Sequence, residues 1–160
     1  MIILYRTPTV VMLLMGLCFG QASAANPYAG KTCTGPYETG NKVTRGAYVL
    51  EFNAAGTGGA LFGNKGSFGD QSFKQFQANP DIPKENLRVD KWGSFSVTEE
   101  AGQFGAFPYN FVLHNINRGT TLYLSALSPQ GTATGRDDIS ARYYAGGANE
   151  LRLTCHDRAK

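Results

Sequence analysis

Short segments in which apolar and polar residues alternate are the feature of this chain that most restricts its fold. Tyr48, Leu50 and Phe52 fall on one face of an extended chain. Val49 and Glu51, which lie between them, fall on the other face. A period of two is typical of a half-buried β-strand, because successive side chains of a strand point to opposite faces. The segments that show this pattern or a strand-like composition are 31–37, 47–53, 60–62, 87–91, 93–98, 107–116, 120–127, 139–144 and 150–155.

Turn residues separate these segments at intervals of about 8–12 residues, which favours an antiparallel all-β domain. Two hairpins are expected: 107–116 with 120–127 around Asn117–Gly119, and 139–144 with 150–155 around Ala145–Asn149. At most one short helix is expected, over 71–78, with Asp70 as its N-cap. The prediction is therefore a small antiparallel barrel, a lipocalin-like up-and-down meander, or a sandwich of about eight strands.

The first 24 residues have the composition of a secretory signal peptide. Arg6 precedes the apolar run 10–19, and the small residues Ala22, Ser23 and Ala24 follow it. A short apolar run that ends at a small-x-small site is typical of a cleaved leader, and it is too short to span a bilayer. The expected organisation is a leader over 1–24 and one β domain over 25–160, exported to the periplasm or secreted, with no membrane span after cleavage.

Two of the three cysteines, Cys33 and Cys155, remain once Cys18 has left with the leader. In an oxidising compartment an even number of cysteines is expected to pair. Cys155 also alternates with Leu151 and Leu153, which places it on the apolar face of the last strand. We therefore expect one disulfide, Cys33–Cys155, between the two ends of the mature chain.

The residues that carry chemistry form no recognisable catalytic pattern. The chain has 15 basic and 12 acidic residues with no dense basic cluster, so no nucleic-acid partner is expected. His114 and His156 lack metal-ligand spacing, and no serine lies in a Gly-x-Ser-x-Gly elbow. We predict no catalytic residue, no metal site and no cofactor.

Two segments resemble known families of secreted proteins. Residues 144–155 resemble the closing hairpin of fungal guanyl-type ribonucleases and ribotoxins, in which a catalytic histidine precedes a disulfide-bonded terminal cysteine. Here Tyr144 occupies the histidine position, so this resemblance implies a catalytically inactive relative. The layout of residues 30–35, with Gly30 and Gly35 in the first strand, resembles that of small exported lipocalin-like barrels. That resemblance implies a binding protein.

The favoured function is an exported binding module without catalysis, which holds a small apolar ligand or inhibits a protein partner through its loops. The alternative is an inactive ribonuclease-like effector. The candidate binding residues are Trp92, Phe104, Phe107 and Tyr109, because they place aromatic rings in and beside a glycine-containing loop. The product is expected to be a monomer.

Overall fold

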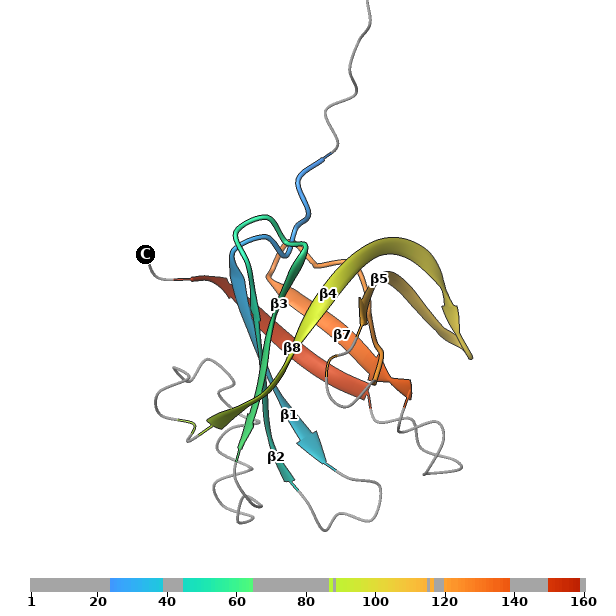
Figure 1. Cartoon of the computed structure of the whole chain (residues 1–160). Coiled ribbons are helices and arrows are strands. Elements are labelled where there is room, and N and C mark those ends of the chain that lie inside the picture. Colours follow the sequence, from blue (N-terminus) through green and yellow to red (C-terminus); the bar gives the residue numbers. More distant parts are fainter. Residues whose placement is uncertain are drawn as a thin grey trace, which may run out of the picture.

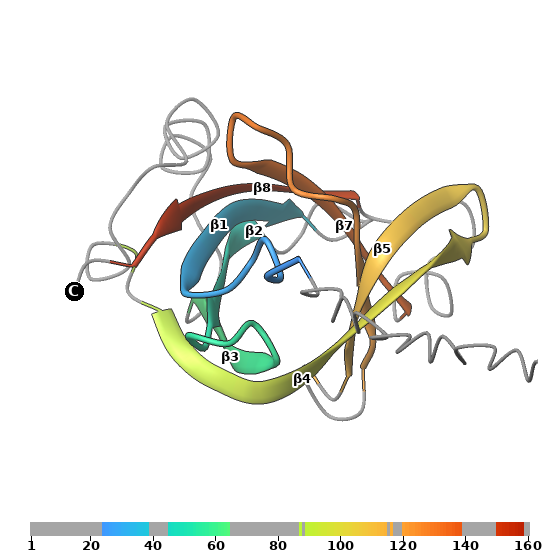
Figure 2. The same cartoon turned by 90° about the horizontal axis from the view of Figure 1, so that it is seen from above.

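The fold is a closed barrel of eight antiparallel strands in which each strand pairs with its neighbours in sequence (Figures 1 and 2). The computed structural model describes residues 24–38, 45–64, 87, 89–114, 116, 120–138 and 150–158. The strands are β1 (Lys31–Glu38), β2 (Arg45–Phe52), β3 (Gly58–Asn64), β4 (Val89–Phe104), β5 (Phe107–His114), β6 (Leu122–Leu124), β7 (Thr132–Asp137) and β8 (Glu150–Asp157). The predicted all-β meander is confirmed, and of the two architectures predicted it is the barrel that forms.

The first and last strands close the barrel, and a disulfide lies between them. β1 pairs with β8 in the register that places Cys33 directly opposite Cys155. Their Cα atoms are 3.9 Å apart, and the two sulfur atoms are bonded across a separation of 122 residues. The predicted Cys33–Cys155 disulfide is confirmed. At the end of the same strand pair, Lys31 Nζ donates to Asp157 Oδ1 at 2.7 Å, and this contact lowers the pKa of the Asp157 carboxyl.

Apolar side chains fill the described part of the barrel interior. The alternation in β2 places Leu50 and Phe52 inside, and the alternation in β8 places Leu151, Leu153 and Cys155 inside. The core further contains Tyr28, Cys33, Leu61, Phe95, Phe111, Leu113, Ile116, Leu122, Leu124 and Ala133. Eight strands enclose a space that such side chains can fill without leaving a large cavity.

Tyr28 closes one end of the barrel from the segment that precedes β1. Seen from above, this segment lies within the ring of strands (Figure 2). The Tyr28 ring is fully buried, stacks on Phe52 at 5.0 Å and meets Phe111 edge-on at 5.1 Å. Its hydroxyl donates to the carbonyl oxygen of Ser125 at 2.8 Å. Burial raises the pKa of this phenol above its ordinary value.

The side chain of Asn26 fixes the path of this N-terminal segment. Its Oδ1 accepts from the Tyr28 amide, and its Nδ2 donates to the carbonyl oxygen of Gly56, both at 2.9 Å. Gly56 has φ 73°, and a Cβ atom there would lie 2.9 Å from the Asn26 side chain. A residue with a side chain would therefore be strained at this position and would also displace Asn26.

A second apolar cluster lies on the outer face of β2 and β3. Val49 is fully buried although it points away from the barrel interior, as its alternation with Leu50 requires. It belongs to a cluster with Ala47, Leu87, Phe62 and Val89. The barrel wall is therefore apolar on both sides at β2, as is usual for strands that are covered on both faces.

Two sequence predictions about strand boundaries are wrong. Segments 87–91 and 93–98 were expected to be separate strands, but residues 89–91 and 93–98 belong to β4, a single strand of 16 residues. The register of β4 against β3 shifts between Leu61 and Phe62, so a bulge bends the strand where a break was expected. β6 is shorter than the predicted segment 120–127.

The predicted hairpin partner of the last strand is also wrong. β8 pairs with β7 on one side and with β1 on the other. β7, Thr132–Asp137, was not predicted as a strand. The predicted strand over 139–144 and the predicted helix over 71–78 lie outside the described residues, as does Tyr144. The other predicted hairpin is confirmed, because β5 pairs with β6.

Candidate binding surface

The β4–β5 hairpin extends beyond the ring of strands and curves away from it (Figures 1 and 2). Phe104 and Phe107 are paired across its tip, so only Gly105 and Ala106 form the turn. Gly105 has φ 60°, and a positive φ at the first central position is typical of a type II′ hairpin turn. Phe104 is therefore the last residue of β4, whereas a loop was predicted there from the sequence.

Three half-buried aromatic rings meet between this hairpin and β6, and we call them the aromatic cluster: Phe104, Tyr109 and Tyr123. Phe104 stacks on Tyr123 with centroids 4.4 Å apart and an interplanar angle of 13°. Tyr109 tilts against Tyr123 at 4.8 Å. The Tyr109 ring lies over Gly102, where an added Cβ atom would be 2.5 Å from the hydroxyl oxygen.

Phe107 is a packing residue at the base of the hairpin tip. Only 8% of its surface is exposed, and the guanidinium carbon of Arg136 lies 5.4 Å from its ring centroid. This geometry is a cation–π contact. The Nε atom of Arg136 is buried and has no hydrogen-bond partner among the described residues. Phe107 thus supports the hairpin from beneath and offers little surface to a partner.

Trp92 lies apart from the other three predicted residues. It is near the opposite end of β4, where it meets Tyr48 edge-on with centroids 5.5 Å apart. Its ring lies against Gly63, and a Cβ atom at that position would overlap it. Trp92 therefore packs against the barrel core, and the structure brings together only Phe104, Phe107 and Tyr109 of the four candidates.

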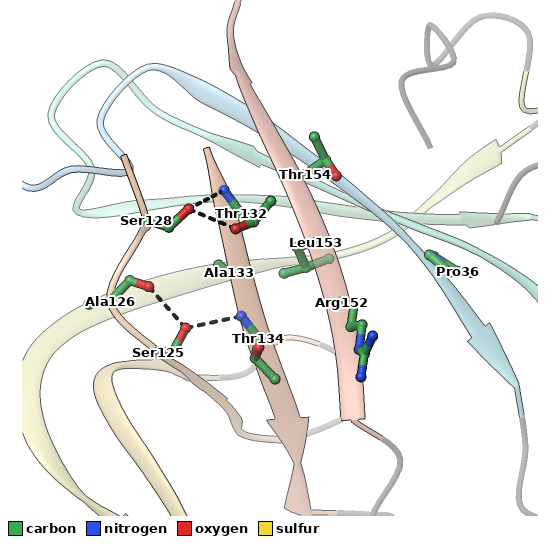
Figure 3. Close-up of a pocket in the computed structure, with 10 residues that line it drawn as sticks. All are labelled: Pro36, Ser125, Ala126, Ser128, Thr132, Ala133, Thr134, Arg152, Leu153 and Thr154. Carbon is green, nitrogen blue, oxygen red and sulfur yellow. Dashed lines mark hydrogen bonds between the residues drawn. The ribbon is translucent and has the colours of Figure 1, made fainter. Parts of the chain in front are cut away.

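A half-open hollow of about 750 Å³ lies on the outer face of β7 and β8, beside the segment 125–128 (Figure 3). Its lining residues are Pro36, Ser125, Ala126, Ser128, Thr132, Ala133, Thr134, Arg152, Leu153 and Thr154. Small-molecule sites usually measure about 300–1,000 Å³, so this hollow has an adequate size. Thr132 pairs with Thr154 and Thr134 pairs with Arg152 across the two strands. Paired residues share a face, so these side chains line the hollow together.

Hydrogen bonds to serine hydroxyls fix the rim of the hollow (Figure 3). The Ser125 hydroxyl accepts from the Thr134 amide at 3.0 Å and donates to the carbonyl oxygen of Ala126 at 3.0 Å. Ser128 Oγ accepts from the Thr132 amide at 3.0 Å and lies 2.7 Å from the Thr132 hydroxyl oxygen. These bonds hold the segment 125–128 against β7, so the rim is formed without a ligand.

The hollow lies beside one member of the aromatic cluster, Tyr123, on the outer face of the sheet. Tyr123 points outward, because Leu122 and Leu124 on either side of it are buried in the core. Ser125 lies two residues further along and continues the pairing with β7, since its amide donates to the carbonyl oxygen of Thr134. Residues two apart on a strand are about 7 Å apart on one face. One elongated ligand can therefore contact both features.

The described residues show no constellation for acid–base or metal chemistry. His114 Nε2 lies 3.2 Å from the Thr98 hydroxyl oxygen, a hydrogen bond that occupies one of its two ring nitrogens. No group of three His, Cys, Asp or Glu side chains within the described ranges could hold a metal ion. None of the described residues belongs to a helix that is long and apolar enough to cross a membrane.

Sequence reasoning missed Tyr123 and the whole hollow. Tyr123 lies within a predicted strand, but the stack with Phe104 depends on the curvature of the β4–β5 hairpin. The serine and threonine residues of the hollow gave one weak signal, since hydroxyl residues recur between positions 125 and 134. Comparison of the chain with protein-family models, curated proteins and solved structures found no match.

Proposed function

We propose that the protein is an exported, non-enzymatic binding protein that holds its ligand or partner on the outside of the barrel. The site comprises the aromatic cluster and the adjoining hollow. The observation that carries this proposal is the aromatic cluster itself, in which two half-exposed rings of a hairpin that extends beyond the ring of strands meet the half-exposed Tyr123 ring of β6. Aromatic side chains are enriched at binding hot spots because they bury a large area with little loss of rotamer freedom.

The packing of the barrel supports a site on its outer face. Tyr28 closes one end, and Phe52, Phe95 and Phe111 pack beneath it. A ligand inside this part of the barrel would have to displace fully buried aromatic rings. The rings of the aromatic cluster, in contrast, are already in contact with solvent, and the hollow beside Tyr123 is open.

The disulfide is compatible with export, because structural disulfides persist in oxidising compartments such as the periplasm and the extracellular space. Together with the leader sequence, it supports a secreted or periplasmic protein. Mass spectrometry of the protein from the exported fraction tests this part of the proposal. We expect an N-terminus at Ala25 and a mass that corresponds to oxidised Cys33 and Cys155. An intact leader or two free thiols would contradict export.

The binding function is tested by capture from the exported fraction of the producing cells with three matched baits. These are the wild-type protein, the Phe104→Ala variant and the His114→Ala variant. The Phe104→Ala change removes the ring that stacks on Tyr123. Truncation of an aromatic side chain that anchors a partner often lowers the binding free energy by about 1–2 kcal/mol. We therefore expect quantitative mass spectrometry to show loss of the captured species with Phe104→Ala only.

His114→Ala is the control for this experiment and also tests for catalysis. Its ring is half-buried on β5, outside the aromatic cluster. Melting curves of all three proteins show whether each variant is folded. Equal capture by the wild type and by a folded Phe104→Ala variant would remove the aromatic cluster from the site. Loss with His114→Ala at unchanged stability would instead favour a chemical role. Tyr144, the position on which the ribonuclease-like alternative depends, lies outside the described residues.

A further inference from the structure

We infer that the open edge of β4 binds an extended, basic segment of a partner protein, which adds to the sheet as a further strand. This inference rests on the proposed function, because it states how an exported binding protein holds a protein partner at the β4–β5 hairpin. Three features of the hairpin lead to it: an unpaired strand edge, exposed carboxylates on that edge, and a bend that disfavours a second copy of the chain.

The outer half of β4 has no neighbouring strand on the side that faces away from β5. β3 begins at Gly58, which pairs with Ser96. The Val97 amide donates to the carbonyl oxygen of Thr57 at 2.9 Å, and beyond it no described residue pairs with β4 on this side. Thr98–Phe104 lies in the hairpin that extends beyond the ring of strands (Figures 1 and 2). This edge is long enough for an added strand of the usual length, about 5–6 residues.

The backbone groups of Glu99 point to the open side. The N–H and C=O groups of successive residues in an antiparallel sheet point alternately to the two neighbouring strands. The Val97 amide points to the β3 side, because it bonds to Thr57. Glu99 follows two residues later in unbroken register with β5, so its N–H points the same way. Main-chain bonds to such donors give an added strand its affinity.

The other edge of the hairpin is less suitable for an added strand. β5 pairs with β6 over Phe111–Leu113 only. In the preceding part of β5, Pro108 has no N–H, and Asn110 Oδ1 already accepts from the Ala126 amide at 2.9 Å. Proline is a usual means of blocking a strand edge, and residues 98–104 contain none. We therefore place the added strand on β4.

The charge of the hairpin favours a basic partner. Glu99 and Glu100 are exposed on the open edge, and residues 97–114 contain no lysine or arginine. The whole chain has a net charge of +3, so the sign of the hairpin is opposite to that of the protein. Lysine or arginine side chains of an added strand can lie beside these carboxylates, and opposite charges on neighbouring strands stabilise their pairing.

The same features disfavour a second copy of this chain as the added strand. Pairing of two β4 edges would bring the glutamates of both copies together, and like charges on neighbouring strands are destabilising. The register of β4 against β5 shifts between Glu99 and Gly102, so a bulge bends the edge. Charges and bulges are means by which proteins prevent pairing between copies. A flexible basic segment can follow the bend and neutralise the charge.

The test uses three capped octapeptides. The first alternates threonine and lysine, the second has glutamate in place of lysine, and the third is the first peptide with every backbone amide N-methylated. Isothermal titration calorimetry at neutral pH and low salt measures their affinities for the wild-type protein. We expect saturable binding of the basic peptide with a Kd below about 1 mM. The other two should bind at least about tenfold more weakly, because one has the wrong charge and the other has no N–H donors.

Variants of Glu99 separate the backbone donor from the charge. Glu99→Gln removes the charge and keeps the N–H, and it should weaken binding of the basic peptide about threefold. Glu99→Pro removes both, and it should bind about tenfold more weakly than Glu99→Gln. Glu51→Gln is the control, because it removes one carboxylate from β2 and not from the hairpin. It should leave the affinity unchanged, and melting curves show whether each variant is folded.

Amide hydrogen exchange of the wild-type protein locates the added strand without any substitution. With saturating basic peptide, the Glu99 amide should exchange at least about tenfold more slowly than in the free protein, because it gains an acceptor. The Val97 amide is the internal control. It already bonds to Thr57 in the free protein, so its exchange rate should not change.

Several outcomes would overturn the inference. These are no saturable binding of the basic peptide below about 1 mM, equal affinity for the N-methylated peptide, or an unprotected Glu99 amide in the bound state. A wild-type dimer that dissociates in Glu99→Pro, measured by sedimentation, would assign the edge to a second copy instead. The capture experiment with Phe104→Ala decides the proposed function separately, because it changes a ring and not the backbone of the edge. The two failures are therefore distinguishable.

Discussion

Replacement of Tyr28 by phenylalanine removes one oxygen atom and tests how much the Tyr28 hydroxyl stabilises the closed end of the barrel. The Tyr28 hydroxyl donates to the carbonyl oxygen of Ser125, and the ring that carries it is fully buried. Loss of such a hydrogen bond should lower the free energy of unfolding by about 1–1.5 kcal/mol at pH 7. Tyr28→Ala also removes the ring from between Phe52 and Phe111, and it should cost about 3–5 kcal/mol.

The pH dependence gives a second, independent readout. Because burial raises the pKa of Tyr28 in the folded protein, the unfolded chain loses this proton first as the pH rises above about 10. The stability that the neutral phenol contributes is therefore complete below pH 10 and is lost as the pH rises towards the folded-state pKa. By pH 11 the wild type should lose about 1.4 kcal/mol relative to Tyr28→Phe, so the two stabilities should converge.

The assay is guanidinium unfolding of the wild type, Tyr28→Phe and Tyr28→Ala between pH 7 and pH 11, followed by circular dichroism. The wild type and Tyr28→Phe share all other titrating groups, so the contributions of these groups cancel in the difference between the two free energies of unfolding. A gap of less than about 0.3 kcal/mol at pH 7 that stays constant to pH 11 would show that the hydroxyl is in contact with water. A loss below about 1 kcal/mol for Tyr28→Ala would show that the ring is not packed in the barrel end.

Three further perturbations test other parts of the structure. Reduction of Cys33–Cys155 removes a cross-link over 122 residues, for which the chain-entropy model gives roughly 5 kcal/mol, so the melting temperature should fall by about 10 °C or more. An unchanged melting curve after reduction, verified by mass, would contradict this. Gly59→Ala places a Cβ atom against the carbonyl oxygen of Glu51 and the Phe95 ring, and it should cost at least about 2 kcal/mol in chemical unfolding. A loss below about 0.5 kcal/mol would refute the close approach of β2 and β3 there. Gly102→Ala meets only the hydroxyl end of the Tyr109 side chain and no backbone atom, so it should shift the ring resonances of Tyr109 and Tyr123 in NMR spectra while stability changes by less than about 1 kcal/mol; unshifted resonances would refute the packing of Tyr109 over Gly102.

The part of the fold that could be predicted from the sequence is the part in which large side chains point inward. The alternation in β2 and β8 was visible because Leu50, Phe52, Leu151 and Leu153 face the core. β7 gave no such signal, since its inward residues are the small Ala133 and Gly135. A Cβ atom at Gly135 would lie 3.0 Å from Leu124, so the leucines of neighbouring strands already fill that space.

The candidate site was predictable to a smaller extent, because it depends on tertiary contacts. Phe104 and Tyr109 were selected as aromatics near a glycine-containing turn, and the structure brings them together. The third member of the aromatic cluster, Tyr123, is 14 residues beyond Tyr109 in the sequence. It meets Phe104 and Tyr109 only because the hairpin is curved. Trp92 was grouped with them because it is aromatic, whereas the bulge between β3 and β4 directs it to Tyr48.

The pairing of β1 with β8 makes this chain a suitable template for circular permutation. Lys31 and Asp157 lie opposite one another and share an ion pair, so a short linker can join the two ends of the barrel. The new N- and C-termini could be placed between Gly105 and Ala106. Only the connection between β4 and β5 would then be lost, and all other neighbouring strands would keep their connections. The cross-link between Cys33 and Cys155 would then span only the linker and the short segments beside it, which include Tyr28. In such a permutant, oxidation should contribute much less to stability, while the order of strands around the barrel stays the same.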